Sequence, residues 1–244
     1  MERLVRRLPA QVKVAALVGF ALAVVAVPRD ALALHAGHAV LLAAVVLAAR
    51  VPGRALARGL TVEVPFVAFA LFLPFVATGP RVEVLGVSLA QAGLAGAASL
   101  LVKATLGMLA AVTLASVTRP AELLDGLRRL RIPAQLVEIG AFMLRYVEVV
   151  GDEWRRMGVA RAARGFVAAS PAAWPALSRS VGALFLRAYE RGERVHLARL
   201  ARGYAGPTGA GGVPATAAQW CAGAALPAAA ALVSATGLLG GWGA

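Results

Sequence analysis

Long apolar runs separated by short polar segments are the feature that most constrains this chain. They cover residues 10–27, 31–49, 61–78, 88–117 and 215–242. A helix of about 20 predominantly apolar residues crosses the hydrocarbon core of a bilayer, and it satisfies its backbone hydrogen bonds internally. The composition agrees, because 60% of the 244 residues are hydrophobic and 15% are charged, against about 25% charged in a soluble domain. We therefore expect an all-α integral membrane protein with about five transmembrane helices.

Three of these runs carry a further signal. The first follows a basic segment and also fits a secretory signal peptide, but the later apolar runs favour a transmembrane helix. Pro65 and Pro74 lie within the third run and predict kinks there. Small residues such as Gly93 in the fourth run would let another helix approach closely.

The basic residues set the expected orientation. The formal net charge is +13, from 25 Lys and Arg against 12 Asp and Glu. Seven of the basic residues lie in segment 2–13 and in a loop at 50–58, and fifteen more lie in residues 118–206. Alternating spans bring these 22 to one side of the membrane, which the positive-inside rule assigns to the cytoplasm. The N-terminus is therefore expected in the cytoplasm, and no nucleic-acid partner is needed to explain the charge.

Three regions are expected along the chain. Residues 1–117 hold transmembrane helices 1–4, residues 118–206 form a cytoplasmic coupling domain, and residues 207–244 hold a Gly-rich linker and the last span. In the middle region Thr118 is expected to cap a short helix that has Pro120 in its first turn. Two longer amphipathic helices should follow it.

These two longer helices end in near-duplicate segments, Ala163-Arg164-Gly165-Phe166 and Ala201-Arg202-Gly203-Tyr204. Glycine adopts the left-handed conformation at a helix C-terminus at little cost, and arginine there suits the negative end of the helix dipole. One interpretation is two well-capped helices. The other, which the duplication favours, is two arginine tips that insert into an acidic groove on another protein. Arg161, Arg194 and Glu190 are assigned to the same docking surface, the last two as an i,i+4 ion pair.

The endings, together with Thr118-Arg119-Pro120, Asp152-Glu153 and residues 189–195, resemble the transmembrane T component of energy-coupling factor (ECF) transporters. The resemblance is closest to the cobalt-type CbiQ branch and extends over essentially the whole chain. It implies that Arg164 and Arg202 dock into two ATP-binding-cassette ATPase subunits. It also implies a CbiM-like substrate-capture subunit beside the spans and leaves room for a small auxiliary subunit.

By the same resemblance, the chain is a noncatalytic subunit of a cobalt importer in the bacterial inner membrane, and it needs no cofactor of its own. Nickel or a vitamin is the alternative cargo. An integral-membrane enzyme is the alternative from another class, and it would need clustered catalytic carboxylates or histidines, which the sequence lacks.

Other polar residues in the apolar runs are weaker candidates. Lys103 is a charge inside the fourth run, which is a functional signal by default, and Glu63 on the neighbouring run is its candidate partner. His35 and His38 are one helical turn apart, but two ligands without a nearby Cys or carboxylate make a poor metal site. We expect them to be interfacial histidines, and we expect His196 to be a packed core histidine.

Overall fold

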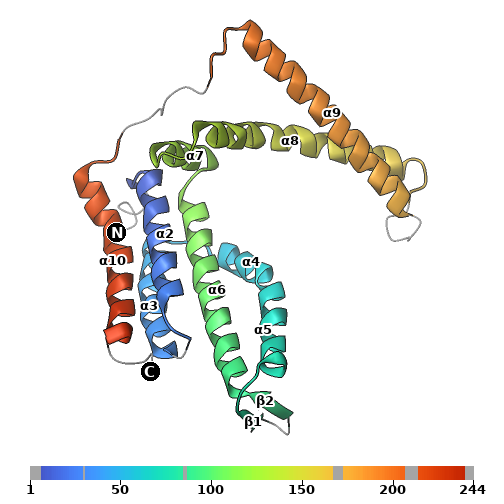
Figure 1. Ribbon diagram of the computed structural model, residues 1–244. Helices are drawn as coiled ribbons and strands as arrows, with labels where there is room; N and C mark the ends of the chain where they lie inside the picture. The colour runs from blue at the N-terminus through green and yellow to red at the C-terminus, as the bar shows by residue number, and fades with distance from the viewer. Residues whose placement is uncertain (1–6, 30, 85–86, 167–172, 207–213, 240–244) are drawn as a thin grey trace. The chain divides into compact units, whose positions relative to one another are not determined.

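The computed structural model describes residues 7–29, 31–84, 87–166, 173–206 and 214–239, and these are mostly helical (Figure 1). The chain forms two compact units. The first unit combines residues 1–130 with residues 212–244, and the second consists of residues 131–211.

The first unit contains the apolar helices and one small hairpin. Its elements in chain order are α2 (Ala10–Ala26), α3 (Leu32–Ala49), α4 (Gly53–Val62), α5 (Val64–Val76), β1 (Arg81–Val84), β2 (Val87–Ala90), α6 (Gln91–Val117), α7 (Pro120–Arg129) and α10 (Ala217–Leu239).

Among the described residues, three helices are long and apolar enough to cross a membrane, namely α3, α6 and α10. Helices α4 and α5 together form a fourth, broken candidate with a bend of 49°. The apolar helix α2 has 17 residues and falls just below the length of the others. The membrane character is therefore confirmed, whereas the number of five spans stays a prediction.

The bend between α4 and α5 lies next to a proline that the sequence had indicated. Pro65 occupies the first turn of α5 and Pro74 lies inside that helix, where a proline removes a backbone hydrogen bond. The prediction of a loop at 50–58 was wrong from Gly53 onward, because α4 begins there. Its apolar residues recur at helical spacing between the arginines, so this segment is amphipathic rather than irregular.

The hairpin is a departure from the expected all-α fold. Strands β1 and β2 pair antiparallel, with Arg81 opposite Ala90 and Glu83 opposite Ser88. The alternation of apolar and polar residues along this segment is typical of a strand. Each strand has only four residues, and the second overlaps the start of the fourth apolar run. A turn was therefore predicted in place of the hairpin.

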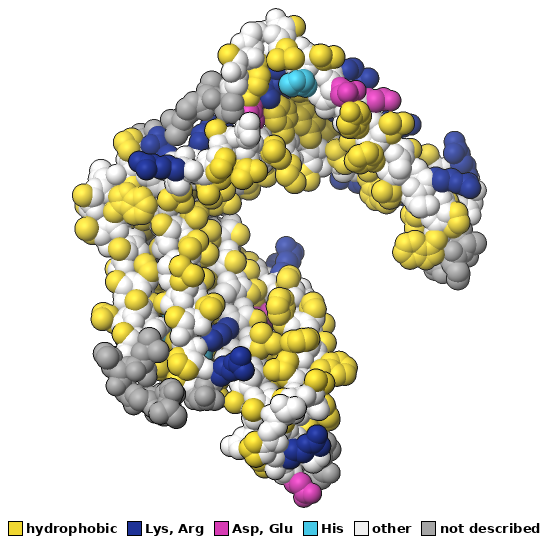
Figure 2. Space-filling view, viewed as in Figure 1, with side chains coloured by type: hydrophobic (Ala, Val, Ile, Leu, Met, Phe, Trp, Pro, Cys, Tyr) yellow, Lys and Arg dark blue, Asp and Glu magenta, His cyan; other side chains and the backbone are white. Residues whose placement is uncertain are grey.

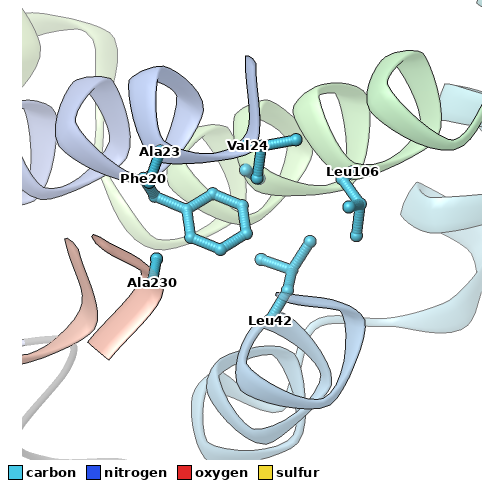
Figure 3. Close-up of a cluster of buried hydrophobic side chains, with 7 residues drawn as sticks. Phe20, Ala23, Val24, Leu42, Leu106 and Ala230 are labelled. Atoms are coloured by element: carbon cyan, nitrogen blue, oxygen red, sulfur yellow. The ribbon is translucent and has the colours of Figure 1, made fainter. Parts of the chain in front are cut away.

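The core of the first unit lies where α2, α3, α6 and α10 meet. The buried side chains there are Phe20, Ala23, Val24, Leu42, Leu106, Ala110 and Ala230 (Figure 3). Phe20 and Ala230 are completely inaccessible to solvent. Small residues bring the helices close: a Cβ atom added at Gly93 of α6 would lie 2.7 Å from the Cα atom of Pro74 in α5. The predicted close approach along the fourth run is thus confirmed.

The two lysines of the chain each bind the end of a neighbouring helix. Lys13, near the start of α2, donates a hydrogen bond of 3.0 Å to the carbonyl oxygen of Val117 at the end of α6. Lys103 of α6 donates to the carbonyl oxygens of Val25 and Val27 at the end of α2, at 3.1 and 2.7 Å. The last carbonyls of a helix have no partner within it and attract positive charge. The antiparallel helices α2 and α6 are therefore capped reciprocally.

Helix α7 packs on the start of α2. Pro120 stands in its first turn, as predicted, and Glu122 lies near the positive end of the helix. Thr118 does not cap it, because the N-cap residue is Arg119 and no side-chain cap bond forms. Instead Thr118 ends α6, and its buried hydroxyl oxygen has no hydrogen-bond partner. Gly126 allows the close contact with α2, since a Cβ atom there would lie 2.7 Å from the backbone nitrogen of Gln11.

The second unit is built from α8 (Ala134–Ala162) and α9 (Trp174–Ala201). Both begin next to a proline, with Pro133 directly before α8 and Pro175 in the first turn of α9. Hydrophobic side chains cover much of the visible surface (Figure 2), and on α8 they include the exposed residues Leu136, Ile139, Met143 and Val147. This spacing places them along one side of the helix. The helices are therefore amphipathic, as expected, with an apolar stripe that the described part of the chain leaves uncovered.

Candidate functional site

Helix α8 ends in a turn that we call the α8 tip, residues 161–166. Gly165 adopts the left-handed conformation, with φ of 76°. The backbone N–H of Gly165 donates to the carbonyl of Ala162 at 3.0 Å, and that of Phe166 donates to the carbonyl of Arg161 at 3.2 Å. These two bonds define a Schellman motif.

Helix α9 ends in the same way at the α9 tip, residues 199–204. Gly203 has φ of 78°. Its N–H donates to the carbonyl of Leu200 at 2.9 Å, and the N–H of Tyr204 donates to the carbonyl of Arg199 at 3.0 Å. The predicted role of the two glycines as helix caps is thus confirmed, and the near-duplicate sequences adopt near-identical backbones.

Each tip carries an inner arginine that is held by aromatic rings. The guanidinium carbon of Arg161 lies 4.7 Å from the ring centroid of Trp154 and 5.7 Å from that of Phe166. The guanidinium carbon of Arg199 lies 4.8 Å from the ring of Phe142 and 3.6 Å from that of Tyr204. Contacts of this kind are attractive because the ring face is electron-rich.

The outer arginines, Arg164 and Arg202, are exposed. Within the described part of the chain, neither forms an ion pair. The flanking Ala163 and Ala201 are also exposed and add no bulk beside them. Each tip therefore presents one guanidinium to solvent on a turn whose backbone and inner arginine are held in place.

The inner arginine of the α9 tip has an additional partner on α8. Glu138 forms an ion pair with Arg199 and accepts a hydrogen bond from the phenol of Tyr204. The hydrogen bond to this carboxylate raises the pKa of the Tyr204 phenol above its ordinary value and raises the pKa of Arg199 as well. At the α8 tip, by contrast, the buried Nε and Nη1 atoms of Arg161 have no hydrogen-bond partner.

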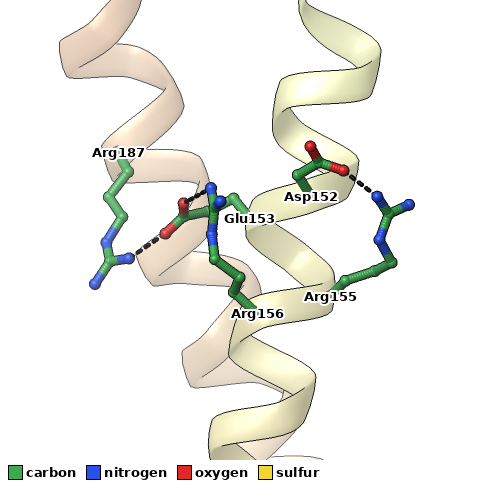
Figure 4. A network of polar contacts seen from close by, with 5 residues as sticks. All are labelled: Asp152, Glu153, Arg155, Arg156 and Arg187. Carbon is green, nitrogen blue, oxygen red and sulfur yellow. Dashed lines mark hydrogen bonds and ion pairs between the residues drawn. The ribbon is translucent and has the colours of Figure 1, made fainter.

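A second polar contact joins the middles of the two helices (Figure 4). Glu153 of α8 forms ion pairs with Arg187 of α9 and with Arg156 one turn along α8, the latter at 3.0 Å. The hydrogen bonds from Arg156 and Arg187 lower the pKa of Glu153. Asp152 pairs with Arg155 on the solvent side of α8. Glutamates of α8 thus bind arginines of α9 at two separate points.

Two of the predicted docking residues lie beside this contact rather than at a tip. Glu190 and Arg194 are exposed and line a recess of about 180 Å³ together with Glu153 and Arg187. They do not form the expected i,i+4 ion pair with each other, because no carboxylate oxygen of Glu190 lies within 4.0 Å of a guanidinium nitrogen of Arg194. The other predicted docking residues, Arg161 and the Ala-Arg-Gly segments at 163–165 and 201–203, lie at the tips.

An apolar groove of about 370 Å³ runs between α8 and α9. Its walls include Phe142, Tyr146, Val150 and Val195. His196 also lines it but is exposed. The prediction of a packed core histidine was therefore wrong, because α8 covers only one side of the apolar face of α9.

Lys103 and Glu63 have different partners in the first unit. Lys103 binds the end of α2, as described above, and Glu63 accepts a hydrogen bond of 3.2 Å from the hydroxyl of Thr105. Residues 103 and 105 project about 200° apart around a helix. The two charges therefore lie on different sides of α6.

The histidine pair is buried in the helix bundle, not placed at an interface with water. His35 and His38 are 2% and 0% exposed. The Nε2 atom of His38 lies 3.2 Å from the hydroxyl of Ser234 in α10, which donates a 2.9 Å bond to the carbonyl of Ala23 in α2. The expected interfacial position was wrong because helix packing buries both rings, with His38 in contact with α10. In the part of the chain that the structure describes, no group of three or more His, Cys, Asp or Glu could hold a metal ion.

Sequence reasoning missed Arg199 of the α9 tip and the residues of α8 that hold the two inner arginines, namely Glu138, Phe142 and Trp154. One signal could have found Arg199, since both endings read Arg-x-Ala-Arg-Gly-aromatic when extended by two residues. Glu138 and Phe142 had no such signal, because they reach the α9 tip across 61 and 57 positions of sequence.

Comparison with known proteins agrees with the architecture. The model of the family described as cobalt transport protein, CbiQ, matches residues 1–210. The cobalt transport protein CbiQ of Rhodobacter capsulatus is 32% identical over 166 residues, which cover 68% of this chain and 66% of that protein. An uncharacterized protein of Methanocaldococcus jannaschii is 29% identical over 100 residues, or 41% of this chain and 37% of that one.

The chain thus spans less than two thirds of the length of these relatives. The family match nevertheless includes every element from α2 to α9 and both tips. This membrane-embedded chain belongs to the CbiQ family of cobalt transport proteins.

Proposed function

We propose that the chain is the transmembrane coupling subunit of an ATP-driven importer of the ECF type, with cobalt ions as its cargo. The observation that carries the proposal is the pair of tips. Each presents one exposed arginine, Arg164 or Arg202, on a glycine-closed turn. An exposed arginine on a closed turn suits an acidic groove, because less backbone freedom is lost on binding. The cobalt cargo rests on the family and on the name of the Rhodobacter relative.

The partners in this proposal are two ATP-binding-cassette ATPases and a CbiM-like substrate-capture subunit. One ATPase takes the α8 tip and the other takes the α9 tip. When ATP draws the ATPases together, the two tips move with them. The ion pairs Glu138–Arg199 and Glu153–Arg187 link the helices at two points, so displacement of one helix is transmitted to the other. The exposed apolar stripe of α8 would carry that movement to the capture subunit.

The proposed orientation follows the distribution of basic residues. The second unit and the N-terminus lie in the cytoplasm, and the apolar helices lie in the bacterial inner membrane. With this orientation 22 of the 25 Lys and Arg are cytoplasmic. The chain itself carries out no catalysis in this scheme, and hydrolysis belongs to the ATPases.

Charge reversal at the tips tests the docking. The variant Arg164→Glu with Arg202→Glu should lose co-purification of both ATPases from membranes while keeping membrane insertion. Removing one partner of a buried interface charge pair costs about 2–5 kcal/mol, and reversal costs more. The matched control is Arg145→Glu with Arg179→Glu, which reverses one exposed arginine on each helix away from the tips. Retained ATPase binding in the tip variant would refute the docking role.

The cargo is tested separately by uptake of radioactive cobalt into cells that express the complete operon. Excess unlabelled cobalt should suppress uptake, and excess nickel should suppress it less. Nickel competing as well as cobalt, or vitamin uptake in place of metal uptake, would keep the coupling role and replace the cargo.

A further inference from the structure

The two tips share a sequence and a backbone, but their inner arginines differ in one respect. Arg199 of the α9 tip has a carboxylate partner on the other helix, and Arg161 of the α8 tip has none among the described residues. Both arginines sit at the same position, three residues before the outer arginine. The two tips therefore differ in how tightly the inner arginine is bound to the other helix. Both present an exposed outer arginine.

The carboxylate that makes this difference is Glu138. Its side chain is 21% exposed and that of Arg199 is 27% exposed, whereas Arg187 and Arg155 in the other ion pairs are 62% and 76% exposed. A more shielded pair is screened less by water and salt. Glu138–Arg199 is thus the best protected of the ion pairs within the described residues of the second unit.

Glu138 also binds the tip at both of its ends. Arg199 begins the closing turn and Tyr204 completes it, and the carboxylate contacts both side chains. Arg202 lies between them, in the part of the turn that projects from the contact. Because Arg199 and Tyr204 both bind Glu138, the direction of this turn is determined by α8 as well as by the end of α9.

We propose that Glu138 is a positioning residue that locks the α9 tip and orients Arg202 toward its ATPase, whereas the α8 tip has no such lock. This inference rests on the docking role proposed above. The two ATPase contacts are then unequal: the α9 tip is preorganised, and the α8 tip adjusts on binding. A preorganised contact loses less freedom on association, so loss of the carboxylate weakens the α9 contact selectively.

The experiment is a double-mutant cycle in the complete complex, reconstituted in lipid nanodiscs with its ATPases. Glu138→Gln keeps the side-chain shape and removes the charge. It should weaken ATPase binding about fivefold, the scale of a partly exposed ion pair. The effect should persist in an Arg164→Ala background and vanish in an Arg202→Ala background, because coupled residues are non-additive and independent ones are additive.

Two further variants separate positioning from folding. Glu148→Gln makes the same change at an exposed glutamate of α8 and should leave binding unchanged. Tyr204→Phe removes the hydrogen bond from the phenol to Glu138 and should produce a smaller loss with the same dependence on Arg202. Both can be compared with Glu138→Gln at equal helical content, measured by circular dichroism.

Equal losses from Glu138→Gln in the two arginine backgrounds would overturn the positioning role and leave the docking role in place. Unchanged binding in Arg164→Ala and in Arg202→Ala would overturn the docking role itself, and with it the inference about Glu138.

Discussion

Replacement of the tip glycines by alanine tests whether the turns themselves are required for ATPase binding. Gly165 and Gly203 have φ of 76° and 78°, and a Cβ atom at either position would meet nothing within 4 Å. Alanine therefore introduces no clash with another residue. Its cost comes only from its own backbone, since the left-handed conformation brings Cβ close to the following carbonyl.

The magnitude follows from that single effect. An L-residue in the left-handed conformation costs about 1–2 kcal/mol, which changes a two-state ratio by a factor of about 5–30. We expect Gly203→Ala and Gly165→Ala each to weaken ATPase binding by roughly this factor, because the closed turn is populated less. The two changes lie on separate tips and should add. Asparagine, which tolerates this conformation better, should lie between alanine and glycine.

The matched controls are Gly151→Ala and Gly192→Ala. These glycines lie inside α8 and α9, and a Cβ atom there also meets nothing within 4 Å. Here alanine stabilises the helix by roughly 0.5–1 kcal/mol. The same substitution therefore stabilises the helix interior, whereas it destabilises the closing turn. Binding is measured by titrating labelled ATPase onto the chain in nanodiscs. If the tip variants bind like the helix-interior variants, the closed turns are not part of the docking surface.

Three further predictions concern stability. Lys103→Met should lower the thermal unfolding temperature in detergent, because the carbonyl of Val27 loses its partner at a cost of about 1–3 kcal/mol; an unchanged temperature would contradict the capping role. Phe20→Ala in the completely buried core should cost about 3–5 kcal/mol, whereas Phe72→Ala on the exposed face of α5 should cost far less, and both are compared by the monodisperse fraction after heating. The pKa of Glu153 is lowered from 4.5, so its contribution is complete above that value and is lost as pH falls through the lowered one. Cross-linking between α8 and α9 should weaken in that acid range, and Glu153→Gln should reduce the pH dependence, leaving the part that depends on Glu138; a parent chain insensitive to acid would contradict it.

Local features of the sequence predicted the elements of this protein well. Apolar runs predicted α3, α6 and α10, and Pro120 predicted the start of α7. Gly165 and Gly203 predicted the two closing turns. Each of these features depends on a few consecutive residues, because helix periodicity, proline geometry and the left-handed conformation are properties of the backbone itself.

Contacts between residues that are distant in the sequence could not be predicted from such local features. The hydroxyl of Thr118 fits an N-cap by sequence, but packing leaves it buried at the end of α6. Lys103 finds the end of α2 rather than Glu63. Such outcomes depend on which helix faces pack together, and neighbouring residues in the chain do not specify that.

The two tips also combine local features that the sequence predicts with contacts that it does not. Their sequence determined the helix ends, the glycine turns and the exposed outer arginines, because a helix terminus is a local structure. Only the tertiary structure decided that Glu138, 61 positions earlier, binds Arg199 while Arg161 lacks a carboxylate. The physical reason is that an ion pair requires two atoms to meet in space, and the antiparallel pairing of α8 with α9 brings them together.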